Sequence, residues 1–352
     1  MSVRADITYS MHKWSDQSQN SALHNAEKTS RSTKDRLYAF LALGAIKGVG
    51  SKTLNSIKNN GRTFHEVLET DNTDEALGYL RHHGARLSGQ SGSSWQEVRD
   101  KALTRARSLL DTFSRDDITV LFSDDDQFPR SLFCLSSPPP WLFVQGSVDV
   151  LSRPSMTVVG TREPSDGGMW LCQYVGYCLK AWGVPTVSGL ADGIDQTIHE
   201  ASLREGVPTI AFLGTGILND YPRGSEFLRK QIIEAGGAVV SEYLPSESYS
   251  KSSFVQRNRL QAALGKVLVP VEWAPRSGTA HTVRFARDLR RPIAGLTLPS
   301  WDKTKVRFPD QEGHIFTLPD EGEAFKDFVA QCLEAEYYVP ESQKPQMELF
   351  EE

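Results

Sequence analysis

The chain has 352 residues, of which 39% are hydrophobic and 24% charged, and its formal net charge is −5. These values are typical of a soluble globular protein with room for two domains. No run approaches the roughly 20 apolar residues that a membrane helix needs, and residues 1–20 are polar, unlike a secretory signal. The four cysteines form no CxxC pair. We therefore expect a cytoplasmic protein with no membrane contact, no metal site and no cofactor.

The first part of the chain predicts an arm and a helical domain. Residues 1–34 are rich in Ser, Asn, Gln and Lys without an apolar period, which indicates disorder. Residues 35–115 carry apolar side chains at helical spacing, and Ser94 is placed to cap a long amphipathic helix. Within this helical domain, Gly48-Val49-Gly50 resembles the turn of a SAM or helix-hairpin-helix domain. Amides of Gly48 and Gly50 in such a turn can bind a DNA phosphate without reading its sequence.

Residues 116–300 predict a Rossmann-like α/β domain. After a proline-punctuated entry segment, short apolar strands alternate with amphipathic helices from Met156 to Leu296. Such alternation is typical of a doubly wound, mostly parallel sheet with helices on both faces. Residues 301–352 form a short acidic extension, in which residues 322–336 predict one amphipathic helix and the last residues a flexible tail.

The loops that follow the predicted strands are polar and rich in glycine. Residues 160–162, 188–193 and 214–216 would meet at the carboxyl edge of the sheet, where α/β proteins bind ligands. Hydroxyl groups and backbone amides suit phosphate oxygens, and Arg162 would add a fork of donors. There is no GxGxxG, no GxxxxGK[ST] and no GxSxG, which disfavours a dehydrogenase, a P-loop nucleotidase and an esterase. For His199 we favour a hydrogen bond to Asp195 over a role as catalytic base.

A basic segment follows these loops. Residues 251–300 hold nine Lys and Arg against two Asp and Glu, whereas residues 301–352 hold five against thirteen. Within 251–259, cations alternate with Phe254, and this mixture suits a sugar–phosphate backbone with a base stacked on the ring. The alternative is that Phe254 belongs to the core and the arginines pair with Glu242 or Glu272. The segment alone does not decide between the two.

Five motifs follow one another along this domain: VVGTR at 158–162, VSGLADGID at 187–195, LGTG at 213–216, FVQRNR at 254–259 and RSGT at 276–279. Read together and in this order, they resemble the DprA/Smf DNA-processing family. The resemblance implies an extended Rossmann-like domain that binds single-stranded DNA, helps to load a RecA-type recombinase and forms a homodimer. It also implies that the protein is not an enzyme.

The resemblance implies the DNA-binding residues as well. They are Arg162, Ser188, Gly189, Lys251, Phe254, Arg257, Asn258 and Arg259. Asp195 would brace the crevice rather than touch the ligand. One departure is Asp192, which stands where the family usually has arginine, and its charge would alter affinity or ligand preference.

The last residues resemble the short peptide that docks bacterial proteins on the replicative sliding clamp. Met347, Leu349 and Phe350 would enter an apolar groove, and Gln346 would fix the direction of the peptide. The alternative is a tail that merely ends with apolar side chains.

Two other functions stay open at this point. Related Rossmann-like hydrolases carry a PGGxGTxxE loop, but residues 274–285 read APRSGTAHTVRF, with no glutamate at the required place. Hydrolysis is therefore the least favoured interpretation. A sensor of a nucleotide-derived small molecule is the main alternative, because Asp192 would place a carboxylate in the crevice.

Overall fold

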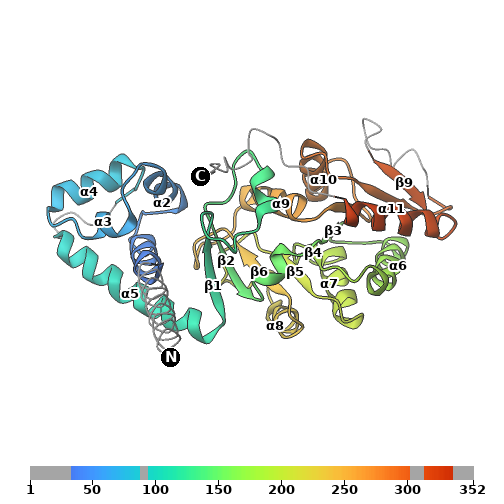
Figure 1. Ribbon diagram of the computed structural model, residues 1–352, viewed down its shortest axis with the longest axis horizontal. Coiled ribbons are helices and arrows are strands. Elements are labelled where there is room, and N and C mark those ends of the chain that lie inside the picture. Colours follow the sequence, from blue (N-terminus) through green and yellow to red (C-terminus); the bar gives the residue numbers. More distant parts are fainter. Residues whose placement is uncertain (1–32, 88–93, 302–312, 336–352) are drawn as a thin grey trace, which may run out of the picture. The chain divides into compact units, whose positions relative to one another are not determined.

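The computed structural model describes residues 33–87, 94–301 and 313–335 and divides into two compact units, Met1–Arg115 and Asp116–Glu352 (Figure 1). Each unit is described by itself. Across the described residues, every helix is either too short or too polar to cross a membrane.

The first unit is helical, as predicted. Residues 33–44 form a helix, followed by α2 (Ser51–Asn59), α3 (Phe64–Leu68), α4 (Thr73–His82) and α5 (Trp95–Arg115). Polar caps mark several starts: the Ser94 hydroxyl accepts a hydrogen bond from the Glu97 amide at 3.3 Å, which is the cap expected for α5. Apolar side chains such as Phe40, Leu54 and Trp95 fill the interior and are at most 1% exposed.

The second unit is built on a seven-stranded sheet in the order β1-β2-β6-β5-β4-β3-β7. The five strands from β6 to β7 are parallel, and β1 and β2 add an antiparallel edge. This confirms the predicted mostly parallel α/β fold. The strands are β1 (Ile118–Phe122), β2 (Trp141–Gly146), β3 (Met156–Val159), β4 (Thr186–Ser188), β5 (Thr209–Phe212), β6 (Ala238–Ser241) and β7 (Val267–Pro270).

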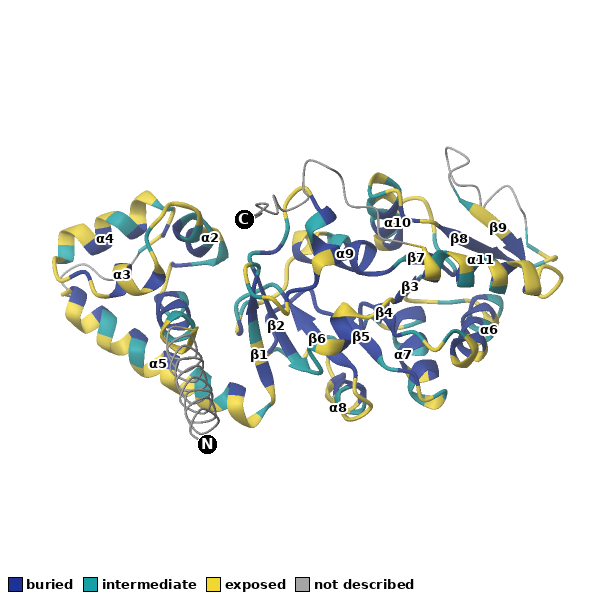
Figure 2. Cartoon of the chain, viewed as in Figure 1, coloured by how far each residue is buried: buried dark blue, intermediate teal, exposed yellow. Residues whose placement is uncertain are grey.

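Helices cover both faces of this sheet. Alternate side chains of a strand point to opposite faces, and on β3 the side chain of Val158 packs with α6 and α7 while Val159 packs with α9 and α10. Figure 2 shows the buried residues concentrated along the strands and on the inner faces of the helices. The helices are α6 (Asp166–Trp182), α7 (Ile194–Arg204), α8 (Glu226–Glu234), α9 (Lys251–Leu264) and α10 (Gly278–Asp288).

The described part of the acidic extension belongs to this core. Strand β9 (His314–Thr317) pairs in parallel with β8 (Ala294–Thr297), and α11 (Gly322–Glu334) follows it. Phe316, Phe325 and Val329 pack in the same apolar cluster as β3 and α6. The predicted helix at 322–336 corresponds to α11. Residues 313–335 pack in the α/β unit, which therefore continues past residue 300, where the sequence placed its end.

Candidate functional site

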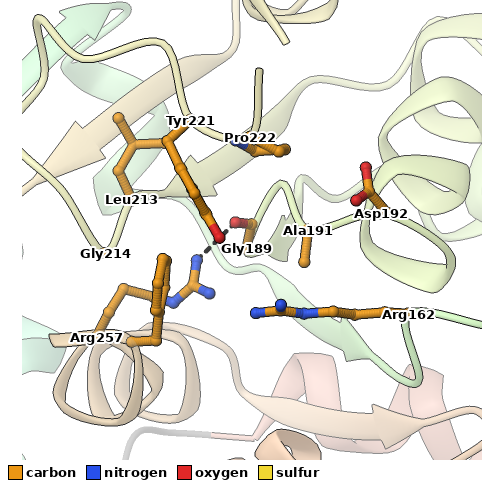
Figure 3. Close-up of a pocket in the computed structure, with 10 residues that line it drawn as sticks. Arg162, Gly189, Ala191, Asp192, Leu213, Gly214, Tyr221, Pro222 and Arg257 are labelled. Carbon is orange, nitrogen blue, oxygen red and sulfur yellow. Dashed lines mark hydrogen bonds between the residues drawn. The ribbon is translucent and has the colours of Figure 1, made fainter. Parts of the chain in front are cut away.

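A pocket lies beyond the carboxyl ends of β3, β4 and β5, beside α9 (Figure 3). Strands β4, β5 and β6 follow β3 to one side and β7 lies on its other side, so the strand order reverses at β3. Such a reversal opens a crevice between the loops that leave the strands, which is where α/β folds bind ligands. The pocket is lined by Arg162, Gly189, Ala191, Asp192, Leu213, Gly214, Tyr221, Pro222, Phe254 and Arg257.

Arg257 forms the base of the pocket. Its side chain is buried, and its guanidinium donates hydrogen bonds to the carbonyl of Gly189 at 2.6 Å and to the carbonyl of Phe212. Its Nε donates to Oδ1 of Asn258 at 3.2 Å. Burial lowers the pKa of Arg257, and the carboxylate of Asp195 opposes that shift. Arg257 therefore holds the loop after β4 and the end of β5 together, with much of its donor capacity already committed.

Asp195 lies buried next to Arg257. Burial raises the pKa of Asp195, while Arg257, the Ser188 hydroxyl and the amides of Ala191 and Gly189 act in the opposite direction. Gly189 has no room for a side chain, because a Cβ there would stand 2.5 Å from Arg257 Nη1 and 2.6 Å from Asp195 Oδ2. This contact explains why glycine is needed at the start of the loop. It also agrees with the bracing role expected for Asp195.

The Ser188 hydroxyl lies beneath the pocket, where it donates to the carbonyl of Val158 at 2.7 Å. Ser188 is fully buried in β4 and is not among the lining residues. Its side chain thus ties β4 to β3.

The prediction that His199 bonds to Asp195 is wrong. Its Nδ1 lies 2.7 Å from the Thr209 hydroxyl, and its Nε2 has no hydrogen-bond partner among the described residues. Asp195 faces Arg257 instead, so the ring turns toward β5, where Thr209 also bonds to Thr186 at 2.6 Å. Burial, and then the charge of Arg257, lower the pKa of His199 to about 3. A neutral, fully buried imidazole without solvent access is a structural group at neutral pH.

The rim of the pocket carries exposed charges of both signs. Arg162 is exposed, and its guanidinium carbon lies 5.8 Å from the centre of the Phe254 ring, within the range of a cation–π contact. Figure 3 shows Arg162 reaching across the pocket toward Arg257. Asp192 is exposed on the same rim and accepts a hydrogen bond from Gln196 Nε2 at 3.1 Å. The rim therefore offers an exposed cation next to an aromatic face, with one carboxylate nearby.

Phe254 is half-buried and lines the pocket, which excludes the alternative that it belongs wholly to the core. Its ring centre lies 5.1 Å from that of Tyr221 and 5.9 Å from that of Tyr249. Phe254 also packs directly against Gly214, because a Cβ on Gly214 would lie 2.3 Å from Cδ1 of Phe254. The sequence interpretation missed both tyrosines as site residues. The sequence does hold a clue to Tyr249: it stands two positions before Lys251, so the alternation of aromatic and basic residues begins with it.

The remaining predicted residues of α9 do not line the pocket. Lys251 is exposed at the first position of the helix, after the capping residue Ser250. Asn258 donates to the carbonyl of Gly278 at 3.1 Å, and Arg259 forms an ion pair with Glu242. The alternative that an arginine pairs with Glu242 therefore holds for Arg259 and not for Arg257.

The Gly48-Val49-Gly50 turn lies in the first unit. Gly48 has a φ of +94°, and a Cβ there would lie 2.1 Å from the Arg86 carbonyl oxygen. Gly50 is the residue before α2. Glycine at position 48 is thus required by the turn itself, whether or not DNA binds. Gln346, Met347, Leu349 and Phe350 of the predicted clamp-binding tail lie outside the described residues, as does nearly all of the predicted arm.

Among the described residues, no group of three or more His, Cys, Asp or Glu side chains is placed to hold a metal ion.

Known proteins resemble this chain over much of its length. Residues 119–307 match the family described as DNA recombination-mediator protein A. The DNA processing protein DprA of Streptococcus pneumoniae is 37% identical over 249 residues, which are 68% of this chain and 84% of that protein. Protein Smf of Synechocystis is 36% identical over 266 residues, 73% of this chain. The match spans 63% of the Synechocystis protein and 47% of the Escherichia coli Smf protein.

Two solved structures of DprA proteins also resemble this chain. The X-ray structure of Streptococcus pneumoniae DprA has a TM-score of 0.57 at 25% identity and covers 82% of this chain and 97% of its own. DprA from Helicobacter pylori, solved for its mode of binding single-stranded DNA, has a TM-score of 0.53 at 25% identity and covers 62% of this chain and 97% of its own. The chain therefore belongs to the DNA recombination-mediator protein A family, also called DprA or Smf.

Proposed function

We propose that the pocket beside α9 binds single-stranded DNA. The observation that carries this proposal is the exposed Arg162 guanidinium next to the half-exposed ring of Phe254, 5.8 Å from its centre. Arginine forks pair with phosphate oxygens, and an accessible ring stacks with any base, so the two together take a nucleotide without reading its sequence. The family to which the chain belongs, with a relative solved for its binding of single-stranded DNA, supports the same ligand.

The eight predicted residues take two kinds of role in this proposal. Arg162, Lys251 and Phe254 contact the strand, because their side chains are accessible at the rim or at the start of α9. The others form the frame that holds these contacts in place, through the buried hydrogen bonds and the ion pair described above. They are Ser188, Gly189, Arg257, Asn258 and Arg259.

The wider role follows from the family. We propose that the protein is a cytoplasmic, homodimeric mediator that helps to load a RecA-type recombinase, and that it has no catalytic activity of its own. Amides at Gly48 and Gly50 would add a second, sequence-independent phosphate contact. The tail at residues 346–350 would dock on a sliding clamp, and a pull-down in which deleting residues 345–352 leaves clamp binding unchanged would refute that part.

One observation favours a second candidate, a sensor of a nucleotide-derived small molecule. Asp192 places a carboxylate on the same rim as Arg162. A carboxylate repels a continuous phosphate backbone, whereas it accepts hydrogen bonds from a base or a sugar hydroxyl.

Fluorescence anisotropy with labelled oligonucleotides distinguishes the two. We expect affinity for single-stranded DNA to rise with length up to about 30 nucleotides, to exceed the affinity for duplex DNA and to fall steeply with salt. Saturable thermal protection by mononucleotides, with no gain from longer strands, would instead identify the sensor.

A further inference from the structure

Three aromatic rings meet beside the pocket. The ring centres of Tyr221 and Tyr249 are 4.7 Å apart, and Phe254 completes a triangle with the 5.1 Å and 5.9 Å separations given above. The planes are tilted by 35° to 37° to one another. We call Tyr221, Tyr249 and Phe254 the three-ring cluster. It begins inside the pocket, which Tyr221 and Phe254 line, and ends outside it at Tyr249.

Tyr249 is the most exposed member of the cluster. Its side chain is 57% exposed, and its hydroxyl makes no hydrogen bond to any described residue. Tyr243 is a useful contrast, because its hydroxyl donates to the Ser253 carbonyl at 2.8 Å and burial raises its pKa. Tyr243 is thus less exposed than Tyr249 and has a hydrogen-bond partner for its hydroxyl. More than half of the surface of Tyr249 is therefore open to solvent beside the pocket, where a base can stack on the ring.

The charges around the cluster fit a strand that continues past the pocket. Arg162 contacts the ring of Phe254 on the pocket side, and Lys251 is exposed two residues after Tyr249. The cluster therefore has one cation against the ring of Phe254 and a second close to Tyr249 along the chain, which suits a phosphate–base–phosphate repeat. A lone nucleotide in the pocket would use Arg162 and Phe254 and leave Tyr249 and Lys251 without a role.

We propose that Tyr249 is a second stacking residue, which receives the base next to the one held at Phe254. The site then takes at least two consecutive nucleotides of an unpaired strand, since bases in a duplex have no free faces to offer. This inference rests on the proposed function, because it assumes that the pocket binds nucleic acid. The competing explanation is that Tyr249 only packs against Phe254 and keeps it in position.

The test compares ligands of increasing length. Unlabelled thymidine 5′-monophosphate and oligothymidylates of two to six nucleotides compete with a labelled six-nucleotide oligothymidylate for the wild-type protein and for Tyr249→Ala and Tyr249→Phe. We expect Tyr249→Ala to weaken the binding of ligands of two or more nucleotides by roughly 5- to 140-fold, as for loss of one base–aromatic stack. The monophosphate should bind all three proteins equally, and Tyr249→Phe should retain wild-type affinity throughout.

Three results would overturn the inference. Wild-type affinity of Tyr249→Ala at every length would mean that the ring touches no base. An equal loss for the monophosphate and the longer ligands would mean that Tyr249 only supports Phe254. Absence of binding by the wild-type protein at any length would refute the proposed function itself, and this outcome is visible before any variant is measured. Denaturant midpoints of the variants exclude misfolding as the cause of a loss.

Discussion

Two arginines at one pocket have opposite surroundings. Arg257 at the base is buried, bonded to carbonyls of two loops and paired electrostatically with Asp195. Arg162 at the rim is exposed and contacts only the face of Phe254 among the interactions described. The donors of Arg257 are thus largely committed to the frame of the pocket, whereas the guanidinium of Arg162 at the rim makes no hydrogen bond to a described residue. Residue type alone does not distinguish a binding cation from a structural one.

The largest expected effect is a loss of stability when Arg257, at the bottom of the pocket, is replaced. Arg257→Met removes the partner of a buried carboxylate and should lower the free energy of unfolding by about 3–5 kcal/mol. Urea denaturation measures this change. The matched control is Arg162→Ala, which should stay within about 0.5 kcal/mol of wild type because the side chain is exposed. Equal losses for the two variants would remove the distinction between base and rim.

The packing between base and rim is tested at Gly214. Gly214→Ala places a Cβ 2.3 Å from Cδ1 of Phe254, so the ring must move. We expect a loss of stability of about 1–3 kcal/mol, as for overpacking, together with weaker DNA binding. Gly78→Ala in α4 is the control, because a Cβ there meets nothing within 4 Å, and it should stabilise the protein by about 0.5–1 kcal/mol. Unchanged DNA binding by Gly214→Ala would show that the position of Phe254 is unimportant.

The buried His199 should make the stability of the protein depend on pH. The pKa of His199 is lowered to about 3, from an ordinary value of 6.5. Below pH 6.5 the unfolded chain binds a proton that the folded protein refuses, so stability falls as the pH falls from about 6.5 toward 3. Between pH 7 and pH 5 this residue should cost about 2 kcal/mol.

Denaturation at both pH values, for the wild type and His199→Gln, isolates this contribution. Because the pKa of Asp195 is raised, its own contribution to stability rises as the pH falls toward its ordinary pKa, opposite to that of His199. This contribution is common to the wild type and the variant. An identical pH dependence in the two proteins would contradict the assignment of His199 as a buried neutral group.

The smallest effect is expected at the rim carboxylate. Asp192→Asn removes a negative charge from the pocket lining while keeping a side chain that can bond to Gln196. DNA affinity should rise by about two- to fivefold at low salt, and the gain should shrink as salt screens the charge. Anisotropy titrations at two ionic strengths measure it. Weaker DNA binding by Asp192→Asn would favour the small-molecule sensor, in which the carboxylate binds the ligand.

Much of this fold follows from patterns along the chain. The alternation of apolar strands and amphipathic helices predicted the α/β fold, and the glycine-rich loops after the strands predicted where the pocket lies. Gly189 and Gly214 stand where a side chain would strike Arg257 and Phe254, so a loop motif in the sequence corresponds to a close approach in space. These features are local or repeat with a fixed period, which makes them predictable without a structure.

The partners of polar side chains were not predictable in this way. Arg257 and Arg259 are two residues apart on α9, yet one lines the pocket and the other pairs with Glu242. His199 bonds to Thr209 of the neighbouring strand rather than to Asp195 on its own helix. Each choice depends on which element packs against the helix at that point. Tyr249 was missed for a related reason, because its nearest ring belongs to Tyr221 in the loop after β5, which is distant in the sequence.

We infer that two exposed cations, Arg162 at the rim and Lys251 at the start of α9, bind a single strand, while the buried Arg257 at the bottom of the pocket only supports them. The test of this division of roles measures the binding of a labelled single strand of about 30 nucleotides by fluorescence anisotropy at two salt concentrations. It compares the wild type with the double variant Arg162→Ala/Lys251→Ala and with Tyr243→Phe. We predict that the double variant stays folded, binds at least about tenfold more weakly and shows a shallower salt dependence, by about one unit of slope for each phosphate that is no longer neutralised. Tyr243→Phe should bind as the wild type does. Wild-type affinity and salt dependence in a folded double variant would contradict this division.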